Sequence, residues 1–163
     1  MRSPLTEQFD ISDDRIRRIV ADAIQGADDG ELFLEYSESE ALTFDNGRLK
    51  TANFSTDQGF GLRVVAGEAS GYAHANELSE AALLRASDAV ATVKHGYSGV
   101  LAAAPQRTNR HLYSDENPIP SPAFDAKARL LQDMDAWLRA KDPRVRQVTA
   151  SLASSWQQVE IVR

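Results

Sequence analysis

The hairpin that decides the fold reads Asp57-Gln58-Gly59-Phe60-Gly61-Leu62-Arg63-Val64-Val65-Ala66-Gly67-Glu68-Ala69-Ser70-Gly71-Tyr72-Ala73-His74-Ala75. Its apolar and β-branched residues predict one strand at residues 60–66 and another at 70–75, joined through Gly67-Glu68. Gly59, Gly61 and Gly71 fall at or inside these strands. A glycine in a strand often marks a bulge or a close approach of another segment to the backbone. The pattern therefore indicates sheet construction.

Upstream of this hairpin the chain keeps a period of two. Apolar residues alternate with polar ones in two runs, Leu32-x-Leu34-x-Tyr36 and Leu42-x-Phe44. Such alternation predicts short strands with one buried face. Asn46-Gly47 tolerates positive φ at both central turn positions, so a tight hairpin turn and a return strand at residues 48–55 are expected.

Three helices are predicted around these strands. The first covers residues 13–25, between a capping Ser12 and a terminating Gly26, and the second runs from a capping Ser79 to Lys94. The third begins at Pro122 and ends before Asp142-Pro143. Its apolar stripe consists of Leu130, Leu131, Met134, Trp137 and Leu138. Met134 and Trp137 lie at helical spacing, and we interpret them as core or as a domain interface rather than a cofactor site.

Strands followed by helices predict an α+β fold. We expect a mostly antiparallel or mixed sheet of short strands with helices packed on one face, then a linker helix and the start of a second sheet. The second sheet would begin with strands at 144–152 and 156–163, joined by a turn at Ser154-Ser155. The expected organisation is a domain at 1–95, a long connecting loop at 96–122, and the linker helix with its following strands at 123–163. Because the last residues keep a strand pattern, we expect the chain to be part of a longer protein.

Composition excludes several classes of function. The 163 residues have a formal net charge of −6, and the Lys and Arg residues are dispersed, so direct binding of nucleic acid is not expected. No apolar run approaches 18 residues, which predicts no membrane span. The chain has no Cys, which fits a reducing compartment and excludes disulfide or thiolate chemistry.

Candidate sites are few. The pair Gly59-x-Gly61 lacks the third glycine and the following helix of a nucleotide-binding turn. We interpret the acidic residues Glu35, Glu38, Glu40 and Asp45 as the solvated face of a sheet rather than as paired catalytic carboxylates.

The three histidines fall in different settings. His95 follows a helix end, where a cation is favoured by the dipole, and His111 lies in the long loop, where we expect an exposed polar residue. His74 lies on a predicted strand. Ordinary packing is the simpler interpretation of His74, and the alternative is that it lines a substrate groove together with Tyr72 and Arg63.

Several strings in this chain are similar to the amino-terminal domain of the TldD/PmbA (TldE) metallopeptidases, also called modulators of DNA gyrase. They are Asp29-Gly30-Glu31-Leu32-Phe33, Leu42 through Arg48, Asp57 through Arg63, Gly67 through Ala75, and Arg144 through Leu152. The order Gly71-Tyr72-Ala73-His74-Ala75 resembles the TldD branch more than the PmbA branch.

This resemblance implies a cytoplasmic zinc peptidase that acts on peptides or unfolded proteins and works as a homodimer or as a heterodimer with a related subunit. The family's metal site is a His-Glu-x-x-x-His helix with a distant Cys in the carboxy-terminal part, and none of these residues occurs here. We therefore predict no catalytic residue, no metal ligand and no bound zinc in this chain, which would be inactive alone. Its expected role is to help form the substrate cleft and the subunit contacts. The alternative is a free-standing binding or assembly module that shares the fold without protease function.

Overall fold

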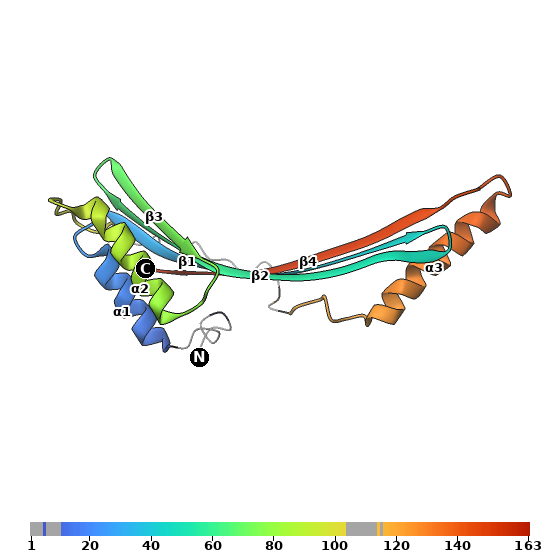
Figure 1. The fold of residues 1–163 in the computed structure, drawn as a ribbon, viewed down its shortest axis with the longest axis horizontal. Helices are drawn as coiled ribbons and strands as arrows, with labels where there is room; N and C mark the ends of the chain where they lie inside the picture. Colours follow the sequence, from blue (N-terminus) through green and yellow to red (C-terminus); the bar gives the residue numbers. More distant parts are fainter. Residues whose placement is uncertain (1–4, 6–10, 104–113, 115) are drawn as a thin grey trace. The chain divides into compact units, whose positions relative to one another are not determined.

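The computed structural model describes residues 5, 11–103, 114 and 116–163 (Figure 1). Its elements, in chain order, are α1 (Asp13–Ile24), β1 (Asp29–Asp45), β2 (Arg48–Ala66), β3 (Ala69–Ala75), α2 (Glu80–Ala91), the 3-10 helix η2 (Thr92–Lys94), α3 (Phe124–Lys141) and β4 (Thr149–Val162). The strands form one sheet in the order β3-β2-β1-β4. The predicted α+β class and antiparallel sheet are confirmed.

The strands are longer than predicted. β1 and β2 each join two segments that the sequence divided, and β4 passes through Ser154-Ser155 without a turn. β4 pairs with β1 in the same sheet, so the expected second sheet is wrong. The polar stretches between the predicted segments are part of continuous strands. Hydrogen bonds to a neighbouring strand keep the backbone extended even where neither face of the strand is buried. Residues 48–58 of β2 show this, since all of them are exposed.

The chain divides into two units, each with a core of its own. Unit 1 comprises Met1–Tyr36, Asp57–Leu112 and Gln158–Arg163, and unit 2 comprises Ser37–Thr56 and Tyr113–Gln157. β1, β2 and β4 contribute residues to both. The domain boundaries expected from the sequence stay a prediction.

In unit 1, α1 and α2 cover one face of the sheet (Figure 1). The buried side chains of α1 are Ile16, Ile19, Val20, Ala23 and Ile24, those of α2 include Leu83 and Val90, and those of the strands include Leu32, Leu34, Leu62 and Val64. The predicted caps are confirmed, since the hydroxyl oxygens of Ser12 and Ser79 accept from the amides of Arg15 and Ala82 at 3.3 and 3.1 Å. Sequence periodicity therefore predicted the helical layer correctly.

The carboxyl end of α1 is satisfied by a distant lysine. The last turn of α1 has no basic residue. Instead, Lys94 at the end of η2 donates from Nζ to the carbonyl oxygens of Ala23 at 2.6 Å, Gln25 at 3.1 Å and Asp22 at 3.4 Å. An ammonium group here neutralises carbonyls that would otherwise lack partners.

Hydrogen bonds to Asp28 hold the segment that follows η2. Tyr97 Oη donates to Asp28 Oδ2 at 2.6 Å, and the amide of Gly67 donates to the same oxygen at 2.8 Å. The Tyr97 hydroxyl, followed by the Gly67 amide, lowers the pKa of Asp28 because both stabilise the ionised carboxylate. The amide of Ala102 also donates to the carbonyl of Asp28, at 2.7 Å. The first residues of the predicted long loop are therefore fastened to unit 1.

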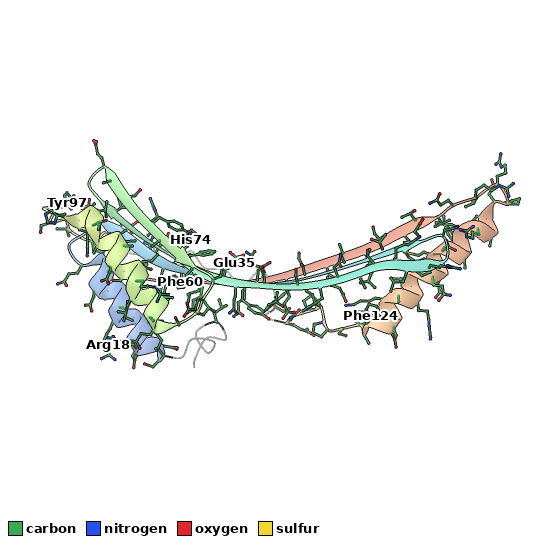
Figure 2. The ribbon with its side chains drawn as sticks, viewed as in Figure 1. Arg18, Glu35, Phe60, His74, Tyr97 and Phe124 are labelled. Atoms are coloured by element: carbon green, nitrogen blue, oxygen red, sulfur yellow. The ribbon has the colours of Figure 1, made fainter. Side chains whose placement is uncertain are left out.

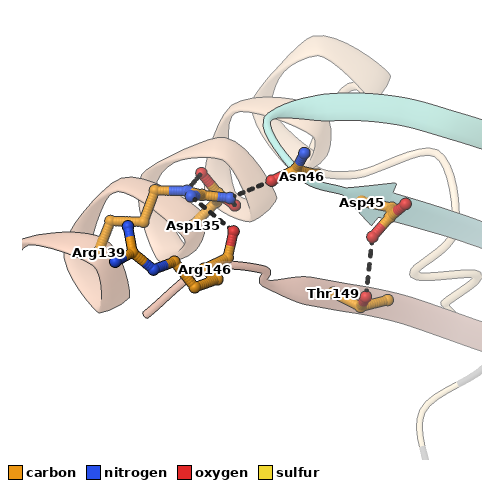
Figure 3. A network of polar contacts seen from close by, with 6 residues as sticks. All are labelled: Asp45, Asn46, Asp135, Arg139, Arg146 and Thr149. Carbon is orange, nitrogen blue, oxygen red and sulfur yellow. Dashed lines mark hydrogen bonds and ion pairs between the residues drawn. The ribbon is translucent and has the colours of Figure 1, made fainter. Parts of the chain in front are cut away.

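In unit 2, the Asn46-Gly47 turn is confirmed, with φ of +50° at Asn46 and +78° at Gly47. Arg139 on α3 donates to Asn46 Oδ1 at 2.5 Å and to Asp135 Oδ2 at 2.9 Å (Figure 3). Beside them, Thr149 Oγ1 donates to Asp45 Oδ1 at 3.0 Å. These contacts join the hairpin to α3 and to the start of β4.

The face of α3 that packs on the sheet has one apolar and two charged residues. It begins at Phe124, two residues after the expected Pro122. Its buried residues are Lys127, Leu131 and Asp135, and the ammonium group of Lys127 donates to Glu40 and to the carbonyl of Ile119.

Leu131 packs with Leu42, Phe44 and Ala150. The other residues of the predicted stripe, Leu130, Met134, Trp137 and Leu138, are 51%, 44%, 59% and 37% exposed. The core alternative is therefore wrong for Met134 and Trp137, and the domain-interface alternative stays a prediction. The helix is turned this way because the sheet offers Glu40 and Asn46 as polar partners. No helix in the described ranges combines the length and apolar character needed to cross a membrane.

Candidate functional site

The face of the unit 1 sheet opposite α1 and α2 carries a second set of side chains. Because side chains alternate along a strand, burial of Leu32, Leu34, Leu62 and Val64 turns their neighbours to this open face. The pairing of β2 with β3 places Gly61 opposite His74 and Arg63 opposite Tyr72. Figure 2 labels His74 on β3 and Glu35 on β1. Three adjacent strands thus contribute to one surface.

A cavity of about 250 Å³ opens on this face. It is lined by Phe33, Glu35, Asp57, Gln58, Gly59, Phe60, Gly61, Tyr72, His74, Ala75 and Asn76. All eleven belong to unit 1. The cavity is therefore built by β1, β2 and β3 together with the residue that follows β3.

Two glycines of β2 that line this cavity allow other groups to approach the backbone closely. A Cβ atom on Gly61 would lie 2.6 Å from Tyr72 Oη, and one on Gly59 would lie 2.9 Å from the carbonyl oxygen of Ala75. The phenol of Tyr72 therefore occupies the space above Gly61, and its ring stacks with that of His74 at a centroid separation of 5.6 Å and an interplanar angle of 26°. The glycines recognised in the sequence act here by close approach, one of the two alternatives that the sequence left open.

The ionisable side chains of the cavity are two carboxyl groups, the imidazole of His74 and the phenol of Tyr72. The carboxyl groups are those of Glu35, which is partly buried, and Asp57, which is exposed. None of the lining residues is Lys or Arg. The surface thus combines aromatic rings with polar groups.

The structure brings together two of the three residues predicted to line a groove. His74 and Tyr72 line the cavity, whereas Arg63 is exposed opposite Tyr72 and is outside the lining. Phe33, Asp57 and Asn76 line it too and were missed by the sequence reasoning. Strand parity was the signal that could have found them, because Phe33 lies between the buried Leu32 and Leu34 and Asp57 has the same parity as Gly59 and Gly61.

The remaining candidates lie elsewhere. His95 is exposed and its amide donates to the carbonyl of Thr92 at 3.3 Å, and His111 lies outside the described residues. Glu40 was expected on a solvated face, but its side chain is only 12% exposed and pairs with Lys127, so that interpretation was wrong for Glu40. Glu38 accepts from Asn117 at 2.7 Å.

The residues present do not fit a zinc centre. Within residues 11–103, 114 and 116–163, no three His, Cys, Asp or Glu side chains converge as metal ligands would. The full sequence has no Cys. That this chain binds no zinc stays a prediction, and no catalytic step is assigned to it.

Comparison with known proteins connects this geometry to a family. Residues 30–93 match the family described as PmbA/TldA metallopeptidase domain 1. A metalloprotease TldD homolog of Haemophilus influenzae is 33% identical over 138 residues, which are 83% of this chain and 29% of that protein. The chain belongs to the TldD/PmbA family. A TldD homolog of Buchnera aphidicola subsp. Acyrthosiphon pisum is 29% identical over 133 residues, 81% of this chain and 28% of the relative.

Solved structures of the TldD/PmbA family share the fold. A Bacteroides thetaiotaomicron protein described as a modulator of DNA gyrase superposes with a TM-score of 0.65 at 15% identity, over 93% of this chain and 37% of its own. TldE from Thermococcus kodakarensis gives a TM-score of 0.58 at 13% identity, over 91% and 34%. The chain spans under a third of the length of the curated TldD relatives and corresponds to their first domain.

Proposed function

We propose that this chain is the noncatalytic first part of a TldD-branch zinc metallopeptidase and that the open face of unit 1 guides an extended peptide. The family match and the names of the curated relatives, each a metalloprotease TldD homolog, support a peptidase parent. Zinc, a cytoplasmic location and peptide or unfolded-protein substrates belong to the same proposal and rest on the resemblance. Hydrolysis is assigned to residues that this chain does not contain.

The observation that carries this proposal is the cavity beside the edge strand β3. β3 pairs with β2 on one side and is the last strand of the described sheet on the other. An unpaired strand edge binds an extended peptide through main-chain hydrogen bonds, while a neighbouring pocket takes an alternate side chain. Tyr72 and His74 belong both to β3 and to the cavity, so one bound strand would engage both features.

The test distinguishes main-chain hydrogen bonding from nonspecific binding of the peptide. Short peptides are N-methylated at alternate amides in the two opposite registers and titrated into the chain, with binding followed by fluorescence anisotropy. Strand addition predicts that one register loses binding and the other keeps it, because only alternate amides face the edge strand. Equal binding by both methylated peptides would contradict the proposal.

A second measurement addresses the catalytic assignment. The chain is mixed with zinc in a calorimeter and then incubated with a labelled unfolded protein. We expect no stoichiometric zinc binding and no hydrolysis. Either stoichiometric uptake or cleavage would show that the metal site was wrongly assigned to other residues.

The exposed stripe of α3 favours the alternative, a binding or assembly module. Leu130, Met134, Trp137 and Leu138 follow one another at helical spacing and are all exposed. On this reading α3 contacts a related subunit, in a homodimer or a heterodimer. Sedimentation of the chain, alone and mixed with a candidate subunit, tests it: Trp137→Ser should abolish association, whereas substitution of the exposed polar Asp133 should not.

A further inference from the structure

We propose that the open face of unit 1 selects an aromatic side chain of the bound peptide, which lies beside the rings of Tyr72 and His74. This inference rests on the proposed peptide-binding function and names the class of residue that the site prefers. Two properties of β3 support it, namely the direction of its main-chain groups and the rings that it carries on the open face.

The main-chain groups of Tyr72 and His74 point to the outer edge of β3. Ala66 at the end of β2 pairs with Ala69 at the start of β3, on either side of a two-residue turn. In such a hairpin the pair next to the turn exchanges hydrogen bonds, and every second residue along the strand then faces the partner strand. Counted in steps of two from Ala69, the odd-numbered residues face β2. Tyr72 and His74 therefore face the outer edge.

The side chains of the same two residues lie on the open face. Ala73 and Ala75 pack against the core that α1 and α2 cover, so alternation turns Tyr72 and His74 the other way. A strand added at this edge places a side chain opposite each of them on the same face, with about 4.5–5.5 Å between the Cβ atoms. A peptide bound here therefore brings alternate side chains into contact with the two rings.

The rings on this face are available for stacking. Tyr72 is 66% exposed, and its ring lies 5.6 Å from that of His74 at an interplanar angle of 26°. Phe33 on β1, which is 36% exposed, lines the same cavity. An aromatic side chain can extend this row or meet a ring edge to face, and such ring pairs contribute more to binding than the area they bury. The site thus favours aromatic character and not only hydrophobicity.

The polar lining of the cavity makes an aliphatic side chain a poorer occupant. Asp57, Gln58 and Asn76 line the cavity beside the rings. An aromatic ring has a positive edge, so it can approach the carboxylate and amide oxygens of these residues favourably. An aliphatic side chain would only displace water from them, which costs free energy without a replacement contact.

The position of the Tyr72 ring depends on Gly61. A Cβ atom on Gly61 would lie 2.6 Å from Tyr72 Oη and 2.9 Å from one of its ring carbons. Gly61→Val should therefore displace the ring while leaving every aromatic residue in the chain. We expect this variant to lose the preference for an aromatic side chain, which separates the placement of the ring from its presence.

The experiment uses the 163-residue chain and the peptide acetyl-Thr-Val-Phe-Val-Thr-amide. The matched peptide has cyclohexylalanine at the centre, which is apolar and of similar size but has no π-system. Binding is measured by two-dimensional NMR titration, with Tyr72 and His74 as reporters. We expect the Phe peptide to bind about twofold to tenfold more tightly, as the contribution of an aromatic pair predicts. A preference below about twofold would overturn the inference.

Ring variants test the same site from the protein side. Tyr72→Leu and His74→Leu should each bring the ratio of the two Kd values towards one, whereas Tyr72→Phe keeps the ring and should preserve the ratio. The matched control is Phe54→Leu, which removes a ring that is 60% exposed from the part of β2 in unit 2, outside the cavity. If Phe54→Leu changes the ratio as much as Tyr72→Leu does, the preference does not arise at this site.

Two small probes, acetyl-phenylalanine amide and acetyl-cyclohexylalanine amide, distinguish failure of this inference from failure of the proposed function. If both peptides bind with equal Kd values, peptide binding stands and the aromatic preference is refuted. If acetyl-phenylalanine amide alone shifts the Tyr72 and His74 signals and no peptide does, the aromatic site stands and peptide guidance is refuted. If no probe shifts these signals, both are refuted.

Discussion

The buried ion pair between Lys127 and Glu40 gives a direct test of how α3 is held in unit 2. The two side chains are only 6% and 12% exposed, and Lys127 Nζ also donates to the carbonyl of Ile119 at 2.5 Å. Lys127→Met preserves the length of the side chain and removes both donations. It leaves the Glu40 carboxylate buried without its cation, and removing one partner of such a pair costs about 3–5 kcal/mol. We expect the free energy of unfolding to fall by that amount.

Two further variants separate the pair from its parts. Lys127→Met combined with Glu40→Leu removes both charges, and an apolar pair of similar volume is often neutral or stabilising, so the double variant should be more stable than Lys127→Met alone. The control is Lys50→Met, which removes a cation 3.9 Å from Asp45 with 57% of the lysine side chain exposed. An ion pair as exposed to solvent as this one contributes less than about 1 kcal/mol to the free energy of unfolding.

Urea denaturation followed by tryptophan fluorescence is the suitable assay. The sequence has two tryptophans, Trp137 and Trp156, and both lie in unit 2. If Lys127→Met lowers stability no more than Lys50→Met, the buried pair does not hold α3. Additive losses in the double variant would lead to the same conclusion, because they would show that the two charges do not interact.

Three other predictions concern unit 1. Lys94→Met removes the donor to the carboxyl end of α1 and should lower stability by roughly 1–2 kcal/mol, measured by thermal unfolding, and an unchanged midpoint would contradict the capping role. The hydrogen bond from Tyr97, followed by one from a backbone amide, lowers the pKa of Asp28, so its stabilising contribution is present above the unfolded pKa of about 3.9 and is lost as pH falls through the lower folded pKa. The difference in thermal midpoint between the unsubstituted chain and Tyr97→Phe should therefore shrink on acidification below pH of about 4, and a difference that persists unchanged would refute the assignment. Gly71→Val places its Cβ 3.3 Å from the backbone of α2 and should lower the free energy of unfolding by about 1–3 kcal/mol. Gly61→Val meets only the movable end of the Tyr72 side chain and should lower it less. The reverse order in urea denaturation would be incompatible with these contacts.

Local signals in the sequence predicted the parts of the fold that local chemistry controls. Ser12 and Ser79 cap helices, and Asn46-Gly47 forms the hairpin turn, because each acts on a backbone within a few residues of itself. The lengths of the strands could not be predicted from such local signals. Pairing with a neighbouring strand keeps Ser154-Ser155 extended, and that partner is distant in sequence.

The candidate site was predicted in part for the same reason. His74 and Tyr72, on one strand, were named as groove-lining residues only as the alternative to packing, and the cavity also needs Phe33 and Asp57 from two other strands. Their convergence depends on the register of the sheet. The orientation of α3 could not be predicted from its own sequence either. An apolar stripe predicts burial of that stripe, and only the position of the Glu40 carboxylate on the sheet shows that Lys127 is buried instead.

The cap that Lys94 provides makes the end of α1 depend on a residue that follows it by about seventy positions. A helix terminus that relies on its own sequence can form early and independently, but this one reaches its full set of hydrogen bonds only after the strands and α2 have been placed. Its last turn is therefore a product of tertiary assembly. The two helices that cover the sheet are tied into one cooperative element, in which release of η2 would also loosen the end of α1.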